Sequence, residues 1–393
     1  MYRTIRLKRG KEESLKRFHP WVFSGAIASA DDGIEEGDIV RVVNSNNEFV
    51  AVGMFQIGSI AVRVLTFKDT AIDHEFWVSR LLSALEMRRA IGIVDNPQNN
   101  TYRLVHGEGD NLPGLVIDCY GPTAVMQAHC VGMHMLRHDI CEALKEVMGD
   151  RMANLYYKSD TTLPFKADIE HENSFIYGGD ENDIAVENGL KFHVDWLRGQ
   201  KTGFFVDQRE NRQLLESYAK NRSVLNMFCY TGGFSVYAMR GGANIVHSVD
   251  SSAKAIELTN RNVAENFGDD PRHEAFCEDA FKFLDANDKK YDLIVLDPPA
   301  FAKHRAALHN ALKGYTRLNV KGLQSIKPGG ILFTFSCSQV VTKDNFRNAV
   351  FTAAVQANRK VRILHQLHQP ADHPINIYHP EGEYLKGLVL YVE

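Results

Sequence analysis

Two short motifs at the ends of predicted strands hold the residues best suited to chemistry. The first follows the strand expected over 293–296 and contains Asp297, Pro298, Pro299 and, after one alanine, Phe301. Two consecutive prolines fix a rigid loop that has no backbone donors of its own. Such a loop can hold the carboxylate of Asp297 towards a flat base that carries an amino group, and Phe301 could stack on that base. We therefore favour a substrate loop over a purely structural turn.

The second motif ends the strand expected over 331–336 and places Cys337 beside the strand of Asp297. A thiol attacks carbon only after it loses its proton, so the surroundings of Cys337 would have to favour the thiolate. Cysteine is also among the residue types most often buried, and a small structural thiol is the alternative. From the residue types alone, both interpretations stay open.

The ends of three earlier strands carry groups that suit a nucleoside. The turn after the strand expected over 224–228 is rich in glycine, which lets the backbone approach a ligand closely. Its candidate contacts are Phe228, Thr231, Gly232, Gly233 and Phe234. Asp250, which precedes Ser251 and lies 18 residues after Gly232, is spaced to bind both hydroxyls of a ribose. Asp279 could accept a hydrogen bond from an adenine amino group. Each group also fits a tight turn or a helix N-cap, but together they favour a nucleoside-binding crevice.

These strand ends belong to a regular alternation of strands and helices that begins near residue 207. The strands expected are 224–228, 245–249, 274–277, 293–296, 331–336, 361–367 and 386–392. Alternating elements of this kind predict an α/β fold with a parallel, doubly wound sheet, similar to the Rossmann fold. Ligands of such sheets bind at the carboxyl ends of the strands, which is where all the motifs above lie.

The first half of the chain is organised differently. Residues 1–70 contain short β-branched or aromatic runs separated by Gly, Asp and Asn turns, which predict a small β-barrel. Residues 71–195 mix strands with helices expected over 73–92 and 132–148, which predicts an α+β connector. We therefore expect three domains, with the doubly wound domain at 196–393.

The composition is that of a soluble globular protein and gives no whole-chain hint of a nucleic-acid partner. The 393 residues are 44% hydrophobic and 24% charged, with a formal net charge of −4. The first 20 residues nevertheless hold seven lysines and arginines against two glutamates, and aromatic Phe18, Trp21 and Phe23 lie beside them. This favours a basic N-terminal arm that contacts phosphates. The six cysteines form no Cys-X-X-Cys pair and no apolar stretch resembles a signal peptide or a membrane span, so we expect a cytoplasmic protein.

The motifs follow the order of a known family. Four further stretches are typical of it, namely His19–Gly25, Glu108–Leu115, Lys201–Arg212 and Pro380–Gly387. Over essentially its whole length the chain resembles the class I S-adenosylmethionine-dependent methyltransferases. Among them it resembles the bacterial RlmI-like family, which makes 5-methylcytosine in large-subunit (23S) ribosomal RNA. The resemblance implies S-adenosylmethionine as cofactor, ribosomal RNA as partner, an N-terminal PUA domain that binds RNA, and a homodimer.

The resemblance also implies a role for most of the candidate residues. Gly232 and its neighbours would cradle the methionine part of the cofactor. Asp250 would hold the ribose, and Asp279 would bind the edge of the adenine. Gln208 and Arg209 would lie near the carboxylate of the cofactor.

The chemistry of this family gives the cysteine a purpose. Carbon 5 of cytosine is a poor nucleophile, but addition of a thiolate to carbon 6 makes carbon 5 nucleophilic. Cys337 would be that thiolate, and Asp297 would stabilise the adduct through a ring nitrogen or the exocyclic amine. The better-known branch of RNA cytosine-5 methyltransferases has a second cysteine after the two prolines. This chain has Ala300 there, so product release must differ.

Two other functions fit parts of the pattern. In an exocyclic-amine or guanine RNA methyltransferase, the loop of Asp297 would suffice and Cys337 would be structural. A non-catalytic RNA-binding assembly factor would keep the cofactor pocket only as a vestige. His134 and His138 lie four residues apart on one expected helix, but a solvated helix face explains them better than a metal, and we expect no metal site. The resemblance would also place His373 near the active site.

Overall fold

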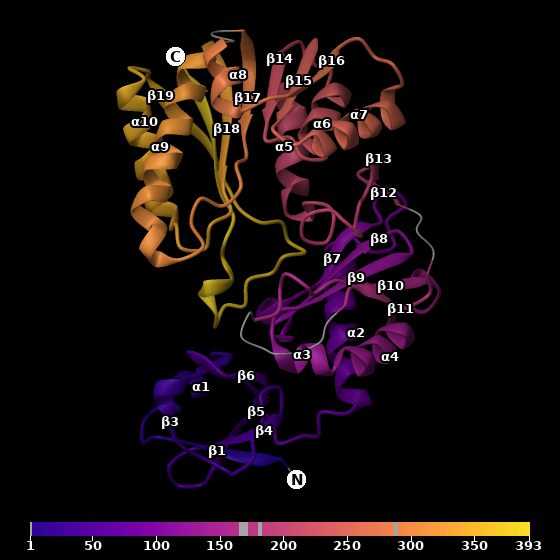
Figure 1. Cartoon of the computed structure of the whole chain (residues 1–393), viewed down its shortest axis with the longest axis vertical. Helices are drawn as coiled ribbons and strands as arrows, with labels where there is room; N and C mark the ends of the chain where they lie inside the picture. Colours follow the sequence, from indigo (N-terminus) through magenta and orange to yellow (C-terminus); the bar gives the residue numbers. More distant parts are fainter. Residues whose placement is uncertain (1, 165–171, 180–182, 287–289) are drawn as a thin grey trace. The chain divides into compact units, whose positions relative to one another are not determined.

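The computed structural model describes residues 2–164, 172–179, 183–286 and 290–393 (Figure 1). The chain divides into two compact units. Unit 1 comprises Met1–Gly189, Val194–Val206 and Ala371–Gly382, and unit 2 comprises Leu190–His193, Asp207–Pro370 and Glu383–Glu393. Unit 1 thus contains a short segment from near the end of the sequence. The finer division into three domains stays a prediction.

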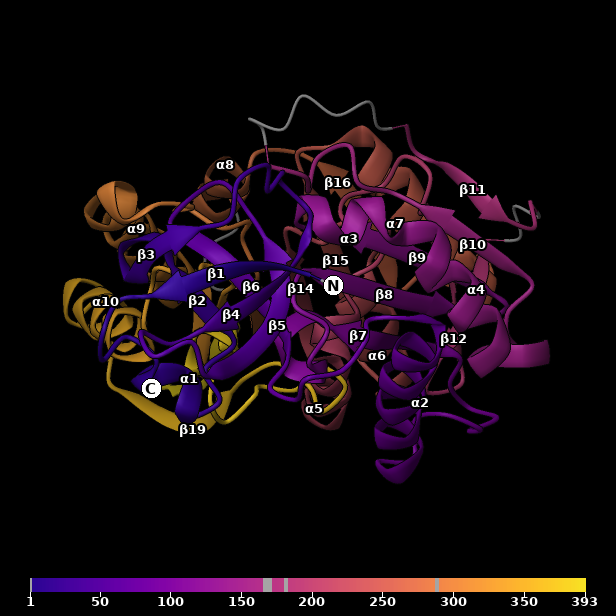
Figure 2. The same ribbon diagram turned by 90° about the horizontal axis from the view of Figure 1, so that it is seen from below.

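The N-terminal part of unit 1 is a six-stranded sheet, whose strands are labelled in Figure 2. It has its own apolar core. In spatial order its strands are β2 (Trp21–Phe23), β6 (Ile60–Thr66), β5 (Phe49–Phe55), β4 (Ile39–Val43), β1 (Arg3–Leu7) and β3 (Ile27–Ala30). The short helix α1 (Glu13–Lys16) lies between β1 and β2 in the sequence. β-Branched residues supply the core, because successive side chains of a strand point to opposite faces. In β4, Val40 and Val42 are fully buried, whereas Arg41 between them is half-exposed.

The basic N-terminal segment is folded into the sheet rather than being an arm, because it contains strand β1 and helix α1. The sequence does not predict β1, because arginines interrupt its apolar pattern. Ile5 and Leu7 are nevertheless fully buried, and β1 pairs with both β3 and β4. Arg3 forms an ion pair with Asp38 at 3.3 Å. Part of the basic charge at this end is therefore compensated within the sheet.

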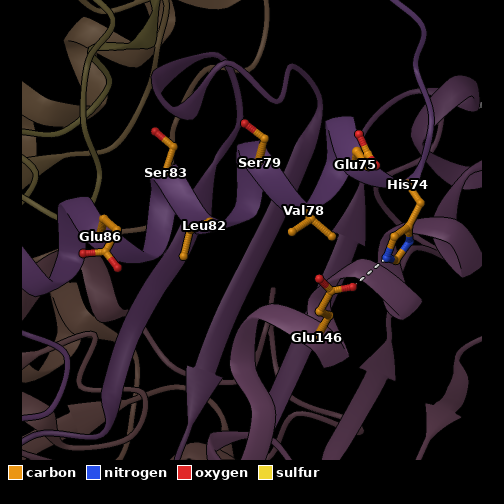
Figure 3. Close-up of a pocket in the computed structure, with 8 residues that line it drawn as sticks. All are labelled: His74, Glu75, Val78, Ser79, Leu82, Ser83, Glu86 and Glu146. Atoms are coloured by element: carbon orange, nitrogen blue, oxygen red, sulfur yellow. Dashed lines mark hydrogen bonds and ion pairs between the residues drawn. The ribbon is translucent and has the colours of Figure 1, made fainter.

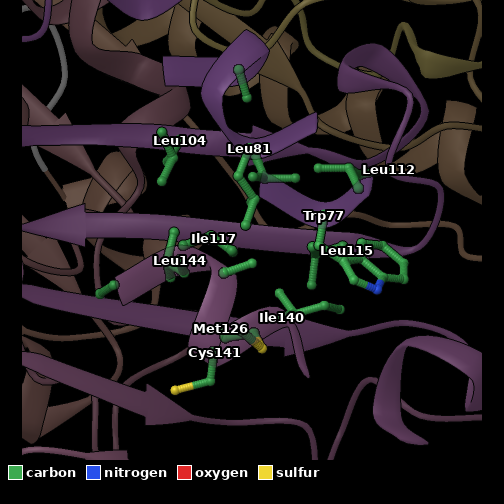
Figure 4. Packing of buried hydrophobic residues seen from close by; sticks show 14 of the residues in the cluster. Trp77, Leu81, Leu104, Leu112, Leu115, Ile117, Met126, Ile140, Cys141 and Leu144 are labelled. Atoms are coloured by element: carbon green, nitrogen blue, oxygen red, sulfur yellow. The ribbon is translucent and has the colours of Figure 1, made fainter. Parts of the chain in front are cut away.

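The second part of unit 1 is a five-stranded sheet covered by helices α2 (His74–Ala90) and α4 (Arg137–Met148). In spatial order its strands are β11 (Ser174–Tyr177), β10 (Asn154–Tyr157), β9 (Thr123–Ala128), β8 (Leu115–Tyr120) and β7 (Thr101–His106). The strand β12 (Ile184–Glu187) lies against β7 and β8. Trp77 and Leu81, four residues apart on α2, meet Ile117 of β8 and Ile140 of α4 in one buried cluster (Figure 4).

The helix expected over 132–148 is two helices. Helix α3 (Val131–Met135) ends and α4 begins at Leu136, which has φ −87° and ψ 4°. The guanidinium of Arg137 donates a hydrogen bond to the carbonyl of His134 at this break, at 2.7 Å. His134 is buried and bonds to the hydroxyl of Tyr157 at 2.6 Å. His134 and His138 therefore do not share a solvated helix face, and that prediction was wrong.

Unit 2 is a seven-stranded sheet with helices packed on it (Figure 1). Its strands in spatial order are β16 (His273–Cys277), β15 (Ile245–Asp250), β14 (Ser223–Met227), β17 (Tyr291–Leu296), β18 (Ile326–Ser336), β20 (Lys386–Val392) and β19 (Val361–Leu367). Its helices are α5 (Arg209–Ala219), α6 (Gly233–Arg240), α7 (Ala253–Phe267), α8 (Ala280–Ala286), α9 (Leu308–Ser325) and α10 (Lys343–Gln356), and β13 (Leu190–His193) lies against α7. Among the described residues of the chain, no helix is long and apolar enough to cross a bilayer.

The sheet of unit 2 confirms the predicted α/β alternation but is not wholly parallel. β16, β15, β14, β17 and β18 run parallel to one another. β20 runs antiparallel to both of its neighbours, because the chain after β19 re-enters the sheet from the same edge instead of crossing it. The order of the strands reverses between β14 and β17, and doubly wound sheets bind ligands beyond the carboxyl ends of the strands at such a point.

Candidate active site

The predicted site residues lie on unit 2, beyond the carboxyl ends of its parallel strands. Phe228 follows β14, Asp250 ends β15 and Asp279 comes two residues after β16. Asp297 follows β17 and Cys337 follows β18, and these two strands are neighbours. The alternation of elements therefore brings these five residues to one edge of the sheet, as their positions in the sequence predict.

The glycine turn after β14 has no room for side chains. Gly232 has φ +73°, and a Cβ atom on it would lie 2.7 Å from the methyl group of Thr259. A Cβ atom on Gly233 would lie 3.0 Å from the side chain of Arg212. Phe228 also has a positive φ, of 59°, which costs about 1–2 kcal/mol in a residue other than glycine. The backbone of this turn is thus held in an unusual path, and both glycines are buried against Thr259 and Arg212.

The other two residues predicted in this turn are buried against the unit. The carbonyl of Thr231 accepts a hydrogen bond from Nδ2 of Asn262 at 2.8 Å. The ring of Phe234 packs against that of Phe335, with centroids 5.7 Å apart. No side chain caps α6, whose N-cap residue is Gly232. Because the first turn of a helix has unpaired backbone N–H groups, this end of α6 suits a carboxylate.

Asp250 is tied to the glycine turn and does not cap the next helix. Its Oδ2 accepts a hydrogen bond from the backbone N–H of Tyr230 at 3.1 Å, and its Oδ1 accepts one from Ser252 at 3.0 Å. The N-cap of α7 is Ser252, whose hydroxyl accepts a hydrogen bond from the backbone N–H of Ala255. The carbonyl of Ser251 accepts a weak hydrogen bond from the thiol of Cys277 at 3.6 Å. Asp250 is thus oriented beside the turn without being needed as a cap.

Asp279 does act as a helix cap. Its Oδ1 accepts hydrogen bonds from the backbone N–H groups of Phe281 and Lys282, at 3.0 and 3.1 Å. The side chain is exposed, and both of these bonds use the same carboxylate oxygen. A structural role for Asp279 therefore does not occupy its whole carboxylate.

Gln208 is positioned by Asp297 rather than by the glycine turn. Its Nε2 donates to Oδ2 of Asp297 at 3.0 Å, and its Oε1 accepts a bond from Nδ2 of Asn211 at 2.6 Å. Gln208, Arg209 and Asn211 are all at least 96% buried. A chain of amides at the start of α5 thus fixes the direction of the carboxylate that ends the β17 motif.

The loop after Asp297 is anchored to α9. Pro298 is buried and Pro299 is exposed. The ring of Phe301 lies 4.6 Å from that of Tyr315, and a Cβ atom on Gly314 would lie 2.9 Å from it. One face of Phe301 is therefore packed on α9, and this packing limits the surface that could stack on a base.

Cys337 differs from the other cysteines in its exposure. Cys119, Cys130, Cys141 and Cys229 are buried, Cys277 is exposed and Cys337 is half-buried. Burial raises the pKa of the Cys119 and Cys229 thiols to about 12, which makes them poor nucleophiles at neutral pH. The next residue, Ser338, is buried, and its hydroxyl bonds to the carbonyl of Ala302 in the loop of Asp297. The cysteine loop and the proline loop are therefore joined.

The residue that sequence reasoning missed is Lys386. It begins β20, lies opposite Ser336 in the sheet, and its Nζ donates to the carbonyl of Ser338. The side chain therefore runs along Cys337, which lies between those two serines. Burial lowers the pKa of Lys386 to about 8, against the opposing effect of Cys337 and Glu383 and with a smaller contribution from Lys343. The signal was present in the tail motif that contains Lys386, but only an antiparallel β20 brings the amine to this edge.

Other predicted candidates lie in unit 1. His373 belongs to the segment 371–382, bonds to Asp372 at 3.1 Å and packs on His106, with ring centroids 5.0 Å apart. In the described ranges, no group of three or more His, Cys, Asp or Glu residues could hold a metal ion.

A hollow on unit 1 has the wrong charge for a phosphate-bearing ligand. It has a volume of about 600 Å³, and the side chains that line it project from α2 and the end of α4 (Figure 3). The residues are His74, Glu75, Val78, Ser79, Leu82, Ser83, Glu86 and Glu146. Its one imidazole, on His74, bonds to Glu146 at 2.8 Å. Three carboxylates without lysine or arginine would repel a polyanion.

Known proteins share both the sequence and the fold. Residues 5–67 match the PUA-like domain family, and residues 175–377 match the S-adenosylmethionine-dependent methyltransferase family. A protein of Tolumonas auensis named ribosomal RNA large subunit methyltransferase I is 42% identical over 99% of both chains. A protein of the same name from Alteromonas mediterranea is 39% identical over 98% of both. The chain belongs to this methyltransferase family.

Solved structures agree with the fold of the methyltransferase. The match to a SAM-dependent methyltransferase from Streptococcus mutans covers 98% of this chain and 100% of that protein, with a TM-score of 0.84 and 22% identity. A methyltransferase in complex with SAH covers 99% of this chain, and 99% of it is covered, with a TM-score of 0.84 and 23% identity. The methyltransferase depends on S-adenosylmethionine, and the residues at the strand ends fit this cofactor. The N-terminus of α6 at Gly232 has no side-chain cap, and the oriented carboxylate of Asp250 is bonded to the same turn.

Proposed function

We propose that this methyltransferase modifies carbon 5 of a cytosine in large-subunit ribosomal RNA through a covalent adduct with Cys337. The observation that carries the proposal is a half-exposed thiol at the end of β18, next to the strand that ends before Asp297 and alongside the amine of Lys386. The name of the relatives supports ribosomal RNA as substrate. The choice of carbon 5 comes from the pairing of a thiol with a carboxylate.

Four residues would hold the cofactor. The turn at Gly232 and Gly233, with the first amides of α6, suits the amino acid part. Asp250 suits the two ribose hydroxyls, and the carboxylate of Asp279 suits the amino edge of the adenine. S-adenosylmethionine, when bound, supplies an electrophilic methyl group.

The residues of the chain then have a balanced sequence of steps. The Cys337 thiolate forms a bond to carbon 6, and the electron pair of the carbon 5–carbon 6 double bond becomes available at carbon 5. Carbon 5 would form a bond to the methyl group as the bond from that group to the cofactor's sulfur breaks and leaves its electron pair on the sulfur. Carbon 5 would keep its own hydrogen until a base removes that proton. The electrons of the C–H bond then restore the double bond, and the bond from sulfur to carbon 6 breaks and regenerates the thiolate.

Asp297 would stabilise the covalent adduct, and Lys386 would stabilise the thiolate. Asp297, whose direction is fixed by Gln208, would stabilise the adduct at the ring nitrogen or the exocyclic amine. Lys386 carries a positive charge at pH 7, because that pH lies below its pKa of about 8. A cation close to a thiol favours the thiolate. Lys386 is therefore a positioning residue that would act through Cys337.

The decisive experiment combines mass spectrometry of nucleosides with a trapped adduct. Cys337→Ala should abolish methyl transfer to an unmodified ribosomal RNA transcript, while calorimetry should show cofactor binding close to that of the wild type. Cys277→Ala is the matched control, because it removes an exposed thiol at another strand end. RNA with 5-fluorocytosine should form a stable covalent complex with the wild type and none with Cys337→Ala, since fluorine cannot leave carbon 5 as a proton does.

The same experiment separates the alternatives. Methylated guanine or an exocyclic N-methyl group, made equally well by Cys337→Ala, would assign the chemistry to the loop of Asp297 alone. Absence of cofactor binding in the wild type would favour an RNA-binding assembly factor. The proposal also includes action in the cytoplasm as a homodimer, and sedimentation of the full chain tests the homodimer.

A further inference from the structure

A second basic stretch of the chain lies on unit 2, outside the N-terminal segment. Residues 301–360 contain ten lysines and arginines and one acidic residue, Asp344. The other 333 residues contain 35 lysines and arginines against 48 acidic residues. A net charge of −4 therefore hides a concentration of positive charge in the region that forms α9 and α10.

Helix α9 aligns three of these cations and one histidine along one face. His309, Lys313, Arg317 and Lys321 recur every four residues, and side chains four apart lie above one another on a helix. At 1.5 Å per residue they span about 18 Å. They form one wall of a groove of about 570 Å³, and residues of α10 complete it. On the opposite wall, α10 contributes the polar side chains of Asn345, Asn348, Thr352 and Gln356.

Two of the cations in this row, Lys313 and Arg317, have no acidic partner among the described residues. Lys321 pairs with Asp285, and the guanidinium of Arg317 lies 4.3 Å from the ring centroid of Phe281. In the described part of the chain, no carboxylate forms an ion pair with Lys313 or Arg317, and both are exposed. Like charges four apart on a helix repel one another. A bound polyanion would relieve that repulsion, and the amides opposite could donate to its oxygen atoms.

The groove is attached to the loop of the candidate active site. Phe301, four residues after Asp297, packs on Tyr315 and approaches Gly314, which follows Lys313 directly. A nucleic-acid strand bound along α9 would thus lead to the part of the same unit that holds Asp297. This is where a substrate whose base must reach Cys337 needs to be held.

We infer that the groove between α9 and α10 binds the phosphodiester backbone of the RNA substrate. The inference rests on the proposed function only in that the substrate is RNA, and it does not depend on which atom receives the methyl group. Charge complementarity selects the ligand, because lysine, arginine and side-chain amides are the groups that contact nucleic-acid phosphates.

The test is a charge reversal with a matched control in the full chain. Lys313→Glu with Arg317→Glu should weaken binding to an unmodified large-subunit ribosomal RNA transcript at least tenfold at 0.1 M salt. The slope of log K against log salt should become shallower by about 1.4, because each phosphate contact to a single strand contributes about 0.7. The control is Lys220→Glu with Lys360→Glu, which makes the same charge change at exposed residues before β14 and β19, at the opposite edge of the sheet.

Three readouts keep the inference falsifiable. The KM for RNA should rise while cofactor affinity stays that of the wild type. If the double variant fails to fold, Lys313→Gln should still reduce the slope by about 0.7. Wild-type RNA affinity and slope in the groove variants, an equal loss in the control, or a change of oligomeric state alone would overturn the inference. A wild type that methylates a base other than cytosine would refute the proposed function and leave these readouts in place.

Discussion

The position of Lys386 makes a prediction about stability at alkaline pH. The residue is 4% exposed, and its amine donates to the backbone carbonyl of Ser338 beside Cys337. Burial lowers its pKa to about 8 from the usual 10.5. Below pH 8 the amine is protonated in both the folded and the unfolded chain, and above pH 10.5 it is neutral in both. Between these values only the unfolded chain binds the proton, so the free energy of unfolding should rise with pH.

The size of this rise follows from the two pKa values. Their difference, from 10.5 to about 8, corresponds to about 3 kcal/mol. Partial solvent screening of the amine should reduce the measured rise to about 2 kcal/mol. Lys386→Met, which has a similar length and no charge, should lack this rise. Lys386→Arg should also lack it, because arginine stays protonated throughout the range.

The assay is urea unfolding of wild type and both variants from pH 8 to pH 10.5, analysed as differences so that other titrating groups cancel. Alkylation of Cys337 at pH 7 adds a readout that a structural role would not move. It should be several-fold slower in Lys386→Met and close to that of the wild type in Lys386→Arg, with Cys277 as an internal control. Parallel stability curves for wild type and Lys386→Met would refute the argument that the buried amine titrates in this range.

Two further perturbations test the cofactor side and the carboxylate. Gly232→Ala should weaken cofactor affinity in calorimetry by about 2 kcal/mol, since the residue must keep φ +73° and its Cβ atom would lie 2.7 Å from the methyl group of Thr259. Adding Thr259→Ser removes that methyl group and should restore part of the affinity. If the affinity does not recover, the clash is not the cause of the loss. Gln208→Leu should lower kcat about tenfold through the lost bond to Asp297, with cofactor affinity unchanged; a loss confined to cofactor affinity would instead support the role near the cofactor carboxylate.

Much of unit 2 could be predicted because its signals are local. The strands expected over 361–367 and 386–392 coincide with β19 and β20, because each is marked by its own periodicity and turn residues. The edge that gathers Asp250, Asp297 and Cys337 followed from alternation alone. β1 was missed because Arg3 and Arg6 mask two fully buried apolar residues.

The direction of β20 could not be predicted, and that direction determines what surrounds the thiol. The alternation of residues in a strand does not reveal whether it runs parallel or antiparallel to its neighbours. The connection before the strand decides which of its ends lies at the edge of the sheet that holds the site. A parallel β20 would have placed Lys386 at the opposite edge from Cys337. The antiparallel pairing of Lys386 with Ser336 places the amine beside the thiol instead. The sequence shows the lysine, but only the topology gives it a chemical neighbour.

The charge of the chain shows the same difference between local sequence and fold. The N-terminal segment is visible in the sequence as basic, yet Arg3 pairs with Asp38 and Lys16 with Glu13. The cations of α9 are diluted by apolar residues between them, and the helix gathers Lys313 and Arg317 on one face without acidic partners in the described structure. Uncompensated charge is what attracts a polyanion. Five of the seven N-terminal cations likewise form no ion pair in the described structure and are exposed, so the fold adds α9 as a second candidate phosphate-binding surface beside the N-terminal segment.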